Sequence, residues 1–183
     1  MDIKKAVLFG ALAVFVLGAG YLSWLIIRDK MLYSQYTNDK EGISMKYPKG
    51  WKVVPYPETG AIVGFVMPKA NALVLFQANW NISATPLAEP LTLEQYAGAA
   101  NAQMTFMFKD VVPSARPVKI SGHEGRELVY LSRKDDGLVF ITYVFIYKNV
   151  AYNITYADEK AAWLDPEKKR RVADVIGSLK VNF

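Results

Sequence analysis

LVFITYVFIY, residues Leu138–Tyr147, is almost continuously apolar and rich in β-branched and aromatic side chains. This composition favours a strand, and the absence of polar and apolar alternation indicates that both faces of that strand are buried. At about ten residues the stretch is too short to cross a membrane as a helix. We therefore expect a central strand, in a sheet that other elements cover on both sides.

The strands beside this one are indicated by the turn signals around it. Asp135–Gly137 precedes it as a hairpin turn, and Lys148–Asn149 follows it as a second turn. Beyond these turns, Arg126–Leu131 has an extended pattern, and Val150–Tyr156 alternates apolar and polar residues. Consecutive strands joined by short turns pair antiparallel, so the sequence predicts an antiparallel meander.

A first helix is predicted to begin after Thr92, because Thr92 and Gln95 have the spacing of a capping box. Apolar residues then recur at three- and four-residue spacings, which gives the helix one face that can pack on a sheet. The apolar residues near its end, from Met104 to Phe108, either pack in the core or form an apolar rim around a ligand site, and we favour core packing. The face comprises Leu93, Tyr96, Ala97, Ala100, Met104 and Met107, with Phe106 and Phe108 nearby.

A second helix is predicted near the C-terminal end of the chain. Asp165 is its N-cap, and Pro166 stands at the first helical position, where the missing N–H group has no cost. Four apolar residues follow at spacings of three and four, so they form a stripe that should pack on the sheet. These residues are Val172, Val175, Ile176 and Leu179.

The remaining extended segments complete the fold class. Before the first helix we predict strands over Ile43–Tyr47, Trp51–Val54, Ile62–Met67 and Leu73–Trp80, and after it a short strand over Val118–Ile120, beyond Pro113 and Pro117. Strands thus precede, separate and follow the helices. We expect an α+β protein, an α/β/α sandwich around a mainly antiparallel β-sheet.

The N-terminal region has a different pattern. Residues 6–27 carry no charge and would reach about 33 Å as a helix, which is enough to cross a bilayer core. We expect a transmembrane signal-anchor helix over 6–27, after a tail over 1–5, and then a polar stalk over 28–40 and a folded domain over 41–183. A cleaved signal peptide is the alternative, although the apolar run is longer than signal sequences usually have.

Composition excludes several classes of function. Without cysteine the chain has no disulfides, no thiolate metal site, no cysteine nucleophile and no lipidated cysteine. The net charge of +5 is not spread over a surface that would bind nucleic acid. Much of it comes from Lys168, Lys169, Arg170 and Arg171, which either are solvated charges at a helix start or contact anionic lipid or an acidic partner.

Candidate catalytic and metal-binding residues are sparse. His123 is the one histidine, and we expect it to lie in an exposed turn. The chain has no G-x-S-x-G sequence that would hold a serine nucleophile. Alternation separates Glu124 from His123 and Glu127, so these residues do not converge on a metal. We expect no enzyme activity, no cofactor and no metal site. Within the apolar segment, Gly10, Val14 and Gly18 have the spacing of a face that packs on another membrane helix.

Four segments give the chain a family resemblance: Gly42–Trp51, Leu91–Tyr96, the paired strands up to Tyr156, and Val175–Val181. Together they resemble the PsbP/DcrB/Mog-like superfamily, over roughly Thr37 to Phe183. The resemblance implies an α/β/α sandwich that is usually non-enzymatic. Its members include extrinsic photosystem subunits, periplasmic or lipid-anchored bacterial proteins and a Ran-binding branch.

Two functions are compatible with these expectations. The first is an accessory or assembly subunit, anchored in the membrane through residues 6–27, whose extracytoplasmic domain docks on a larger membrane protein complex, with electron-transfer complexes as candidates. The alternative is a periplasmic protein that stands alone and binds a small molecule or a lipid in a cleft between sheet and helix. The predicted location is the cell membrane, as a single-pass protein whose C-terminal domain is periplasmic or lumenal.

Overall fold

The computed structural model describes residues 3–56, 60–69, 76–134 and 136–181, and in the N-terminal helix the side chains of 3–14, 16, 19 and 26 lie outside the description. The chain divides into two compact units, Met1–Ser34 and Gln35–Phe183. The elements in order are α1 (Ile3–Leu32), β1 (Tyr33–Asn38), β2 (Ile43–Pro48), β3 (Lys52–Tyr56), β4 (Ala61–Val66), β5 (Asn79–Pro86), α2 (Leu93–Met107), β6 (Val111–Ile120), β7 (His123–Ser132), β8 (Leu138–Tyr147), β9 (Val150–Glu159), α3 (Lys160–Trp163), α4 (Pro166–Gly177) and β10 (Lys180–Val181).

The first unit consists mainly of α1, which begins before the predicted span and continues beyond it. In the part of the chain that the structure describes, no helix is both long and apolar enough to cross a membrane. The transmembrane helix expected over 6–27 is therefore not found among the described residues, and it stays a prediction. Residues 28–40, the expected stalk, contain the end of α1 and the strand β1, and their role as a stalk stays a prediction.

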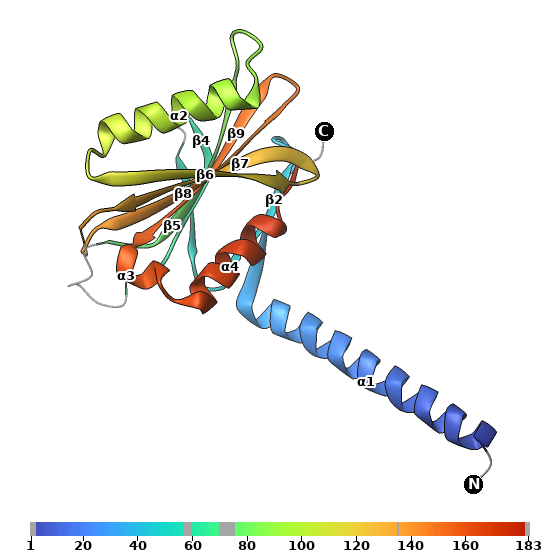
Figure 1. The fold of residues 1–183 in the computed structure, drawn as a ribbon. Coiled ribbons are helices and arrows are strands. Elements are labelled where there is room, and N and C mark those ends of the chain that lie inside the picture. The colour runs from blue at the N-terminus through green and yellow to red at the C-terminus, as the bar shows by residue number, and fades with distance from the viewer. Residues whose placement is uncertain (1–2, 57–59, 70–75, 135, 182–183) are drawn as a thin grey trace. The chain divides into compact units, whose positions relative to one another are not determined.

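The second unit is α+β, and its sheets are antiparallel, as predicted (Figure 1). Among the described residues, seven strands form one sheet in the order β3-β4-β5-β9-β8-β7-β6, and three form a smaller sheet in the order β1-β2-β10. The predicted meander is confirmed as β7, β8 and β9, each paired with the next. The predicted single sheet is instead two, since β2 pairs with β10 near the end of the chain.

The large sheet has a different layer on each face (Figure 1). On one face, α2 packs on a buried cluster of Leu128, Tyr130 and Val144. On the other face, the ring of Trp80 stacks on that of Tyr143 and contacts the tilted ring of Tyr156. Strand alternation explains this division, because Tyr143 and Val144 are neighbours in β8 and so point to opposite faces. Both faces of β8 are buried, as its composition predicts.

Helix α2 follows its sequence signals at its start and departs from them at its end. Thr92 and Gln95 form the expected capping box, with hydrogen bonds in both directions. Met104 and Phe108 pack against the core, as predicted. The core positions expected for Phe106 and Met107 are wrong, because their side chains are 79% and 55% exposed.

Two strands of the large sheet, β6 and β5, differ from the predicted segments. β6 runs from Val111 to Ile120 and contains both Pro113 and Pro117, whereas only its last residues were expected to be extended. Because β6 is an edge strand, its prolines can sit where a backbone N–H would otherwise point away from the sheet. The strand expected over Leu73–Trp80 lies largely outside the described residues, and β5 begins at Asn79.

Tight turns appear where the sequence indicates them. The turn expected over Pro48–Gly50 is closed by a 3.2 Å hydrogen bond from Trp51 N to Pro48 O, and Gly50 has φ +87°. This left-handed backbone is one that glycine adopts without steric cost. Lys148 and Asn149 also have positive φ values, as a two-residue hairpin turn between β8 and β9 requires.

Candidate functional site

A cleft of 190 Å³ opens between α4 and the face of the large sheet opposite α2, and we call it the α4 cleft. The sheet contributes the rings of Trp80 and Tyr156, and the helix contributes Val172 and Val175. These four side chains are almost fully buried, so the floor of the cleft is apolar. The other lining residues are Pro48, Trp51, Met67, Asp165, Glu167, Lys168 and Arg171.

Helical periodicity explains which cations reach this cleft. Lys168 and Arg171 are spaced like Val172 and Val175 around α4, at three- and four-residue intervals, so all four lie on one side of the helix. Lys169 and Arg170 are not among the lining residues. The basic run Lys168–Arg171 is thus divided, with two members at the cleft and two elsewhere, and its contact with lipid or a partner stays a prediction.

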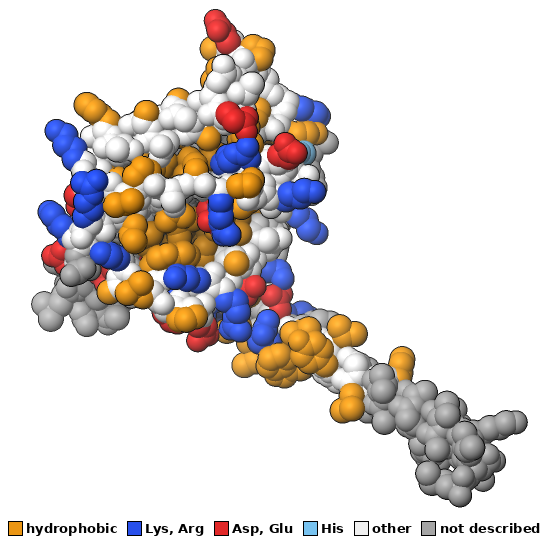
Figure 2. Space-filling view, in the orientation of Figure 1, with side chains coloured by type: hydrophobic (Ala, Val, Ile, Leu, Met, Phe, Trp, Pro, Cys, Tyr) orange, Lys and Arg blue, Asp and Glu red, His pale blue; other side chains and the backbone are white. Residues whose placement is uncertain are grey.

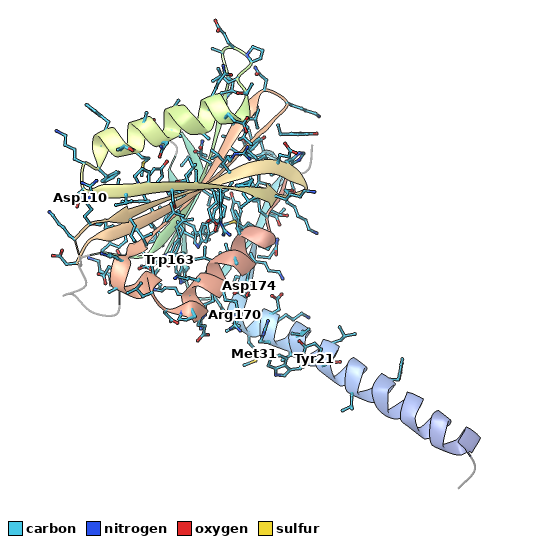
Figure 3. The ribbon with its side chains drawn as sticks, viewed as in Figure 1. Tyr21, Met31, Asp110, Trp163, Arg170 and Asp174 are labelled. Carbon is cyan, nitrogen blue, oxygen red and sulfur yellow. The ribbon has the colours of Figure 1, made fainter. Side chains whose placement is uncertain are left out.

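The cations of the basic run each have a partner within the domain. Arg171 donates to Glu167 across 2.7 Å, and Arg170 lies 3.8 Å from the same carboxylate. The ammonium group of Lys169 lies over the ring of Trp163, 5.5 Å from its centre; Figure 3 shows Trp163 on α3 and Arg170 on α4. Local anions and a ring therefore balance much of the charge that the sequence places here.

Lys168 has the most buried partner of the four. Its Nζ lies 2.7 Å from Oδ2 of Asp158, a residue that is only 3% exposed. The hydroxyl of Tyr156 donates to the same oxygen across 2.5 Å, and the N–H of Glu159 donates to Oδ1. Burial raises the pKa of Tyr156, and the hydrogen bond and charge of Asp158 raise it further. Through its ion pair with Lys168, the carboxylate of Asp158 connects β9 to α4 beside the cleft.

Sequence reasoning missed this network. Glu159, the next residue after Asp158, occupies the N-cap position of α3, although its side chain makes no cap hydrogen bond. The available signal was the spacing of Tyr156 and Asp158, which places both side chains on one face of a strand. The pairing with Lys168 depends on how α4 folds back, and no local pattern indicates it.

A second buried carboxylate lies at the edge of the large sheet. Glu127 of β7 accepts two hydrogen bonds from Arg116 of β6, at 2.5 and 2.8 Å. The hydrogen bond and the charge of Glu127 raise the pKa of Arg116. Tyr143, opposite Glu127 in β8, also has a raised pKa, chiefly because it is buried and further because of the charge of Glu127. This cluster attaches the edge strand to the sheet.

His123 has an environment different from the expected exposed turn. It is the first residue of β7, half-buried, and its ring stacks on Phe145 with centres 5.7 Å apart. Tyr147 lies 4.7 Å away on a tilted plane. Glu127 is engaged with Arg116, and the described residues contain no group of three histidine or carboxylate side chains placed to hold a metal.

The predicted packing face in the N-terminal segment lies within α1. The surroundings of Gly10 and the side chain of Val14 are outside the described part of the chain. At Gly18, a Cβ atom would meet nothing within 4 Å. Association of this face with another membrane helix stays a prediction.

Exposed apolar side chains occur at one end of the large sheet, on segments that belong to both of its faces. Phe106 and Met107 end α2, Val112 at the start of β6 is 51% exposed, and Leu164 after α3 is 66% exposed. Backbone hydrogen bonds attach the residues before β6 and the start of α3 to the connection between β7 and β8, from Arg133 N to Asp110 O and from Lys160 N to Gly137 O. Figure 2 shows hydrophobic side chains on both sides of β6, with Lys and Arg side chains around them. We call these four residues the apolar end.

The layers, the strand order and the cleft under α4 define an α+β sandwich with antiparallel sheets. The chain belongs to the family described as PsbP-like protein, which matches residues 28–181. The superfamily resemblance in the sequence is thereby confirmed. No curated protein sequence matches the chain.

Solved structures with the same fold have low sequence identity to the chain. The structure is similar to cyanobacterial PsbP (CyanoP) from Synechocystis sp. PCC 6803, with 16% identity, a TM-score of 0.61, and coverage of 82% of this chain and 93% of that one. It is similar to LpqN, involved in cell envelope biogenesis of Mycobacterium tuberculosis (10%, 0.56, 82% and 86%). It is also similar to the Saccharomyces cerevisiae Ran-binding protein Mog1p (6%, 0.52, 81% and 95%).

Proposed function

We propose that the chain is a non-enzymatic accessory or assembly subunit that docks its folded domain on a larger membrane protein complex. The observation that carries the proposal is the apolar end, where Phe106, Met107, Val112 and Leu164 are each more than half exposed. Phe106, Met107 and Val112 lie close together, where α2 ends and β6 begins, and exposed apolar side chains gathered at one place commonly mark a surface that binds another protein. Membership of the PsbP-like family supports the proposal, and electron-transfer complexes are the first candidates for the partner.

The proposal includes an anchor and a location. Residues 6–27 are uncharged, and as a membrane helix they would keep the domain close to an integral complex. The domain then lies on the periplasmic or lumenal side of the membrane. Accessibility of an engineered cysteine in the domain to an impermeant thiol reagent, in intact cells or spheroplasts, tests this location. Labelling only after lysis would contradict it.

The test of docking uses the tagged full-length protein, extracted in a mild detergent. Native gels and mass spectrometry should place it in a complex larger than the chain itself, with residues 6–27 still attached. Replacing Phe106 and Met107 together by Ser should release most of the protein from that complex. Val53→Ser is the matched control, because Val53 is also exposed, at 42%, but lies on β3. A free monomer under all mild conditions would contradict the proposal.

The basic run supplies a separate test of contact with anionic lipid or an acidic surface. Replacing Lys169 and Arg170 by Gln removes two charges without touching the α4 cleft. If these cations bind an anionic surface, flotation of the full-length protein with vesicles rich in anionic lipid, or its retention by the complex, should fall and become less sensitive to salt. Unchanged association in a normally folded variant would leave the two residues as solvated charges.

The α4 cleft favours a second candidate function, in which the protein stands alone and binds a small molecule or a lipid. The cleft is apolar at its floor and has charged residues at its rim, as ligand sites commonly do. Native mass spectrometry of the purified full-length protein, released from detergent in the gas phase, tests this candidate. A bound small molecule on a lone monomer would favour it over docking.

A further inference from the structure

The α4 cleft suggests what the docked partner contributes, so the following inference rests on the proposed docking function. Its volume is 190 Å³. Sites for drug-sized ligands occupy about 300–1,000 Å³, and a cavity of about 150 Å³ lined by apolar side chains holds one benzene molecule. The α4 cleft therefore has room for a single ring and too little room for a long acyl chain.

The walls of the cleft favour an aromatic ring over an aliphatic group. Trp51, Trp80 and Tyr156 offer ring faces and edges, and aromatic pairs gain from such contacts beyond the area that they bury. Met67 adds a thioether, which also makes favourable contacts with rings. Val172 and Val175 close the opposite side as part of α4.

The charged residues at the rim of the cleft favour a polypeptide as the ligand over a charged amphiphile such as a fatty acid. Each cation at the rim already has a carboxylate, since Arg171 pairs with Glu167 and Lys168 pairs with the buried Asp158. A fatty acid would bring a further carboxylate to cations that are already neutralised, beside Asp165 as well. A peptide backbone around a side chain is neutral, and its N–H and C=O groups can hydrogen-bond to both members of an exposed ion pair.

We propose that the α4 cleft binds one aromatic side chain of the partner polypeptide, with the ion pairs of the rim around it. This arrangement matches the anatomy of protein interfaces, in which an anchor residue fills a pocket and a polar rim excludes water from it. The larger complex contributes the aromatic side chain, and this chain contributes the cleft that it fills.

The experiment fills the cleft and follows the complex. Arg171→Trp and Met67→Trp each place an indole at the cleft, and Ala173→Trp is the matched control, an exposed position on α4 outside the cleft lining. All are made in the full-length protein in mild detergent, and thermal melts establish that they fold. Apparent affinity for the complex should fall about tenfold or more for the two cleft variants, which corresponds to about 1.4 kcal/mol. Ala173→Trp should bind like the wild type.

A crosslink identifies the occupant. p-Benzoylphenylalanine in place of Trp51 should crosslink, on illumination of intact membranes, to a peptide of the partner that contains Phe, Tyr or Trp. Replacing that aromatic residue of the partner by Ala should abolish the crosslink. If the complex forms but tolerates both cleft variants, or if position 51 crosslinks only to lipid or a small molecule, the inference is overturned and docking stands. If the wild type forms no complex, docking fails and the inference fails with it.

Discussion

Tyr130 and Tyr156 are buried on opposite faces of the large sheet, and their hydroxyl groups differ in what they contact. The hydroxyl of Tyr156 donates to Asp158. The hydroxyl of Tyr130 is fully buried against α2, and no described residue accepts its hydrogen bond. A buried polar group without a partner loses its hydration without replacement, whereas a hydrogen bond to a charged group stabilises the fold.

Replacing these tyrosines by Phe should therefore have opposite effects. Tyr130→Phe removes an unsatisfied hydroxyl and should raise the free energy of unfolding by about 1 kcal/mol. Tyr156→Phe removes a donor from a buried carboxylate and should lower it by about 1.5–3 kcal/mol. Urea denaturation of both variants measures the difference. Equal losses of stability in the two variants would mean that Tyr130 has a hydrogen-bond partner after all.

The pair of Lys168 and Asp158 should dominate the energetics of the basic run. Lys168→Met leaves the carboxylate of Asp158 buried without its cation and should cost about 2–3 kcal/mol, less than a fully buried pair because Lys168 is 29% exposed. Lys169→Met changes an exposed lysine that lies over Trp163, so its effect should stay within about 0.5 kcal/mol. Thermal melts of the two variants compare neighbouring residues in one helix. Similar melting temperatures would contradict the importance of the buried pair.

Among the elements, α2 has the clearest local determinant of its boundary. Thr92→Ala removes the side-chain acceptor for Gln95 N and should lower the free energy of unfolding by about 1 kcal/mol. Thr105→Ala is the control, since that hydroxyl bonds back to Asn101 O within the helix and alanine favours a helix interior. Denaturant midpoints should fall for the first variant and hold or rise for the second. A fall of the same size in both would argue against the capping box.

Both edges of the large sheet contain prolines. β6 has Pro113 and Pro117, and β3 at the other edge has Pro55 within an irregular register. Replacing Pro113 and Pro117 by Val should add two outward N–H donors to a long edge strand. Such a strand can pair with another chain, so we expect concentration-dependent dimers or larger species. Light scattering during size-exclusion chromatography measures them, and a strictly monomeric double variant would show that the prolines do not protect this edge.

Local signals predicted some elements well and others poorly. The capping box, the Asp165-Pro166 helix start and the Lys148–Asn149 turn depend on residues a few positions apart, and the structure has all three, whereas the turn expected over Asp135–Gly137 lies partly outside the described residues. The pairing of β2 with β10 depends on residues at opposite ends of the domain, so no window of sequence contains it. β6 was underestimated because proline weakens a strand prediction unless its edge position is known.

In the candidate site, too, the features that depend on nearby residues could be predicted and those that depend on distant residues could not. The helical spacing of Lys168 and Arg171 could have placed both on one side of α4, although the sequence prediction treated the four cations as a single run. The cleft itself could not be predicted, because its walls come from β2, β5, β9 and α4 and from residues that follow β2 and β4, which meet only in the folded domain.

At the scale of the whole molecule, buried tyrosines should set the alkaline limit of stability. Burial raises the pKa of Tyr130 to about 12, from 10.0, and raises those of Tyr143 and Tyr156 as well. Below pH 10 these groups are neutral in both states, and their contribution is fully present. Above pH 10 the unfolded chain ionises first, so stability should fall as the pH rises towards 12.

For Tyr130 alone the shift corresponds to about 3 kcal/mol once both states are ionised. Unfolding midpoints from pH 8 to 12 measure the loss, and Tyr130→Phe should reduce its slope. A midpoint that is constant over this range would contradict the burial of these phenols.

The pairing of β2 with β10 has a consequence for the order in which the domain can assemble during synthesis. Ile43 and Met45 of β2 are fully buried in the finished domain, and Lys46 N donates a hydrogen bond to Ser178 Oγ, 132 residues further along the chain. The β7–β9 meander can form from neighbouring hairpins while translation continues, but β2 must wait for α4 and β10. During that interval its apolar side chains are available to chaperones, or to the same segment of another nascent chain.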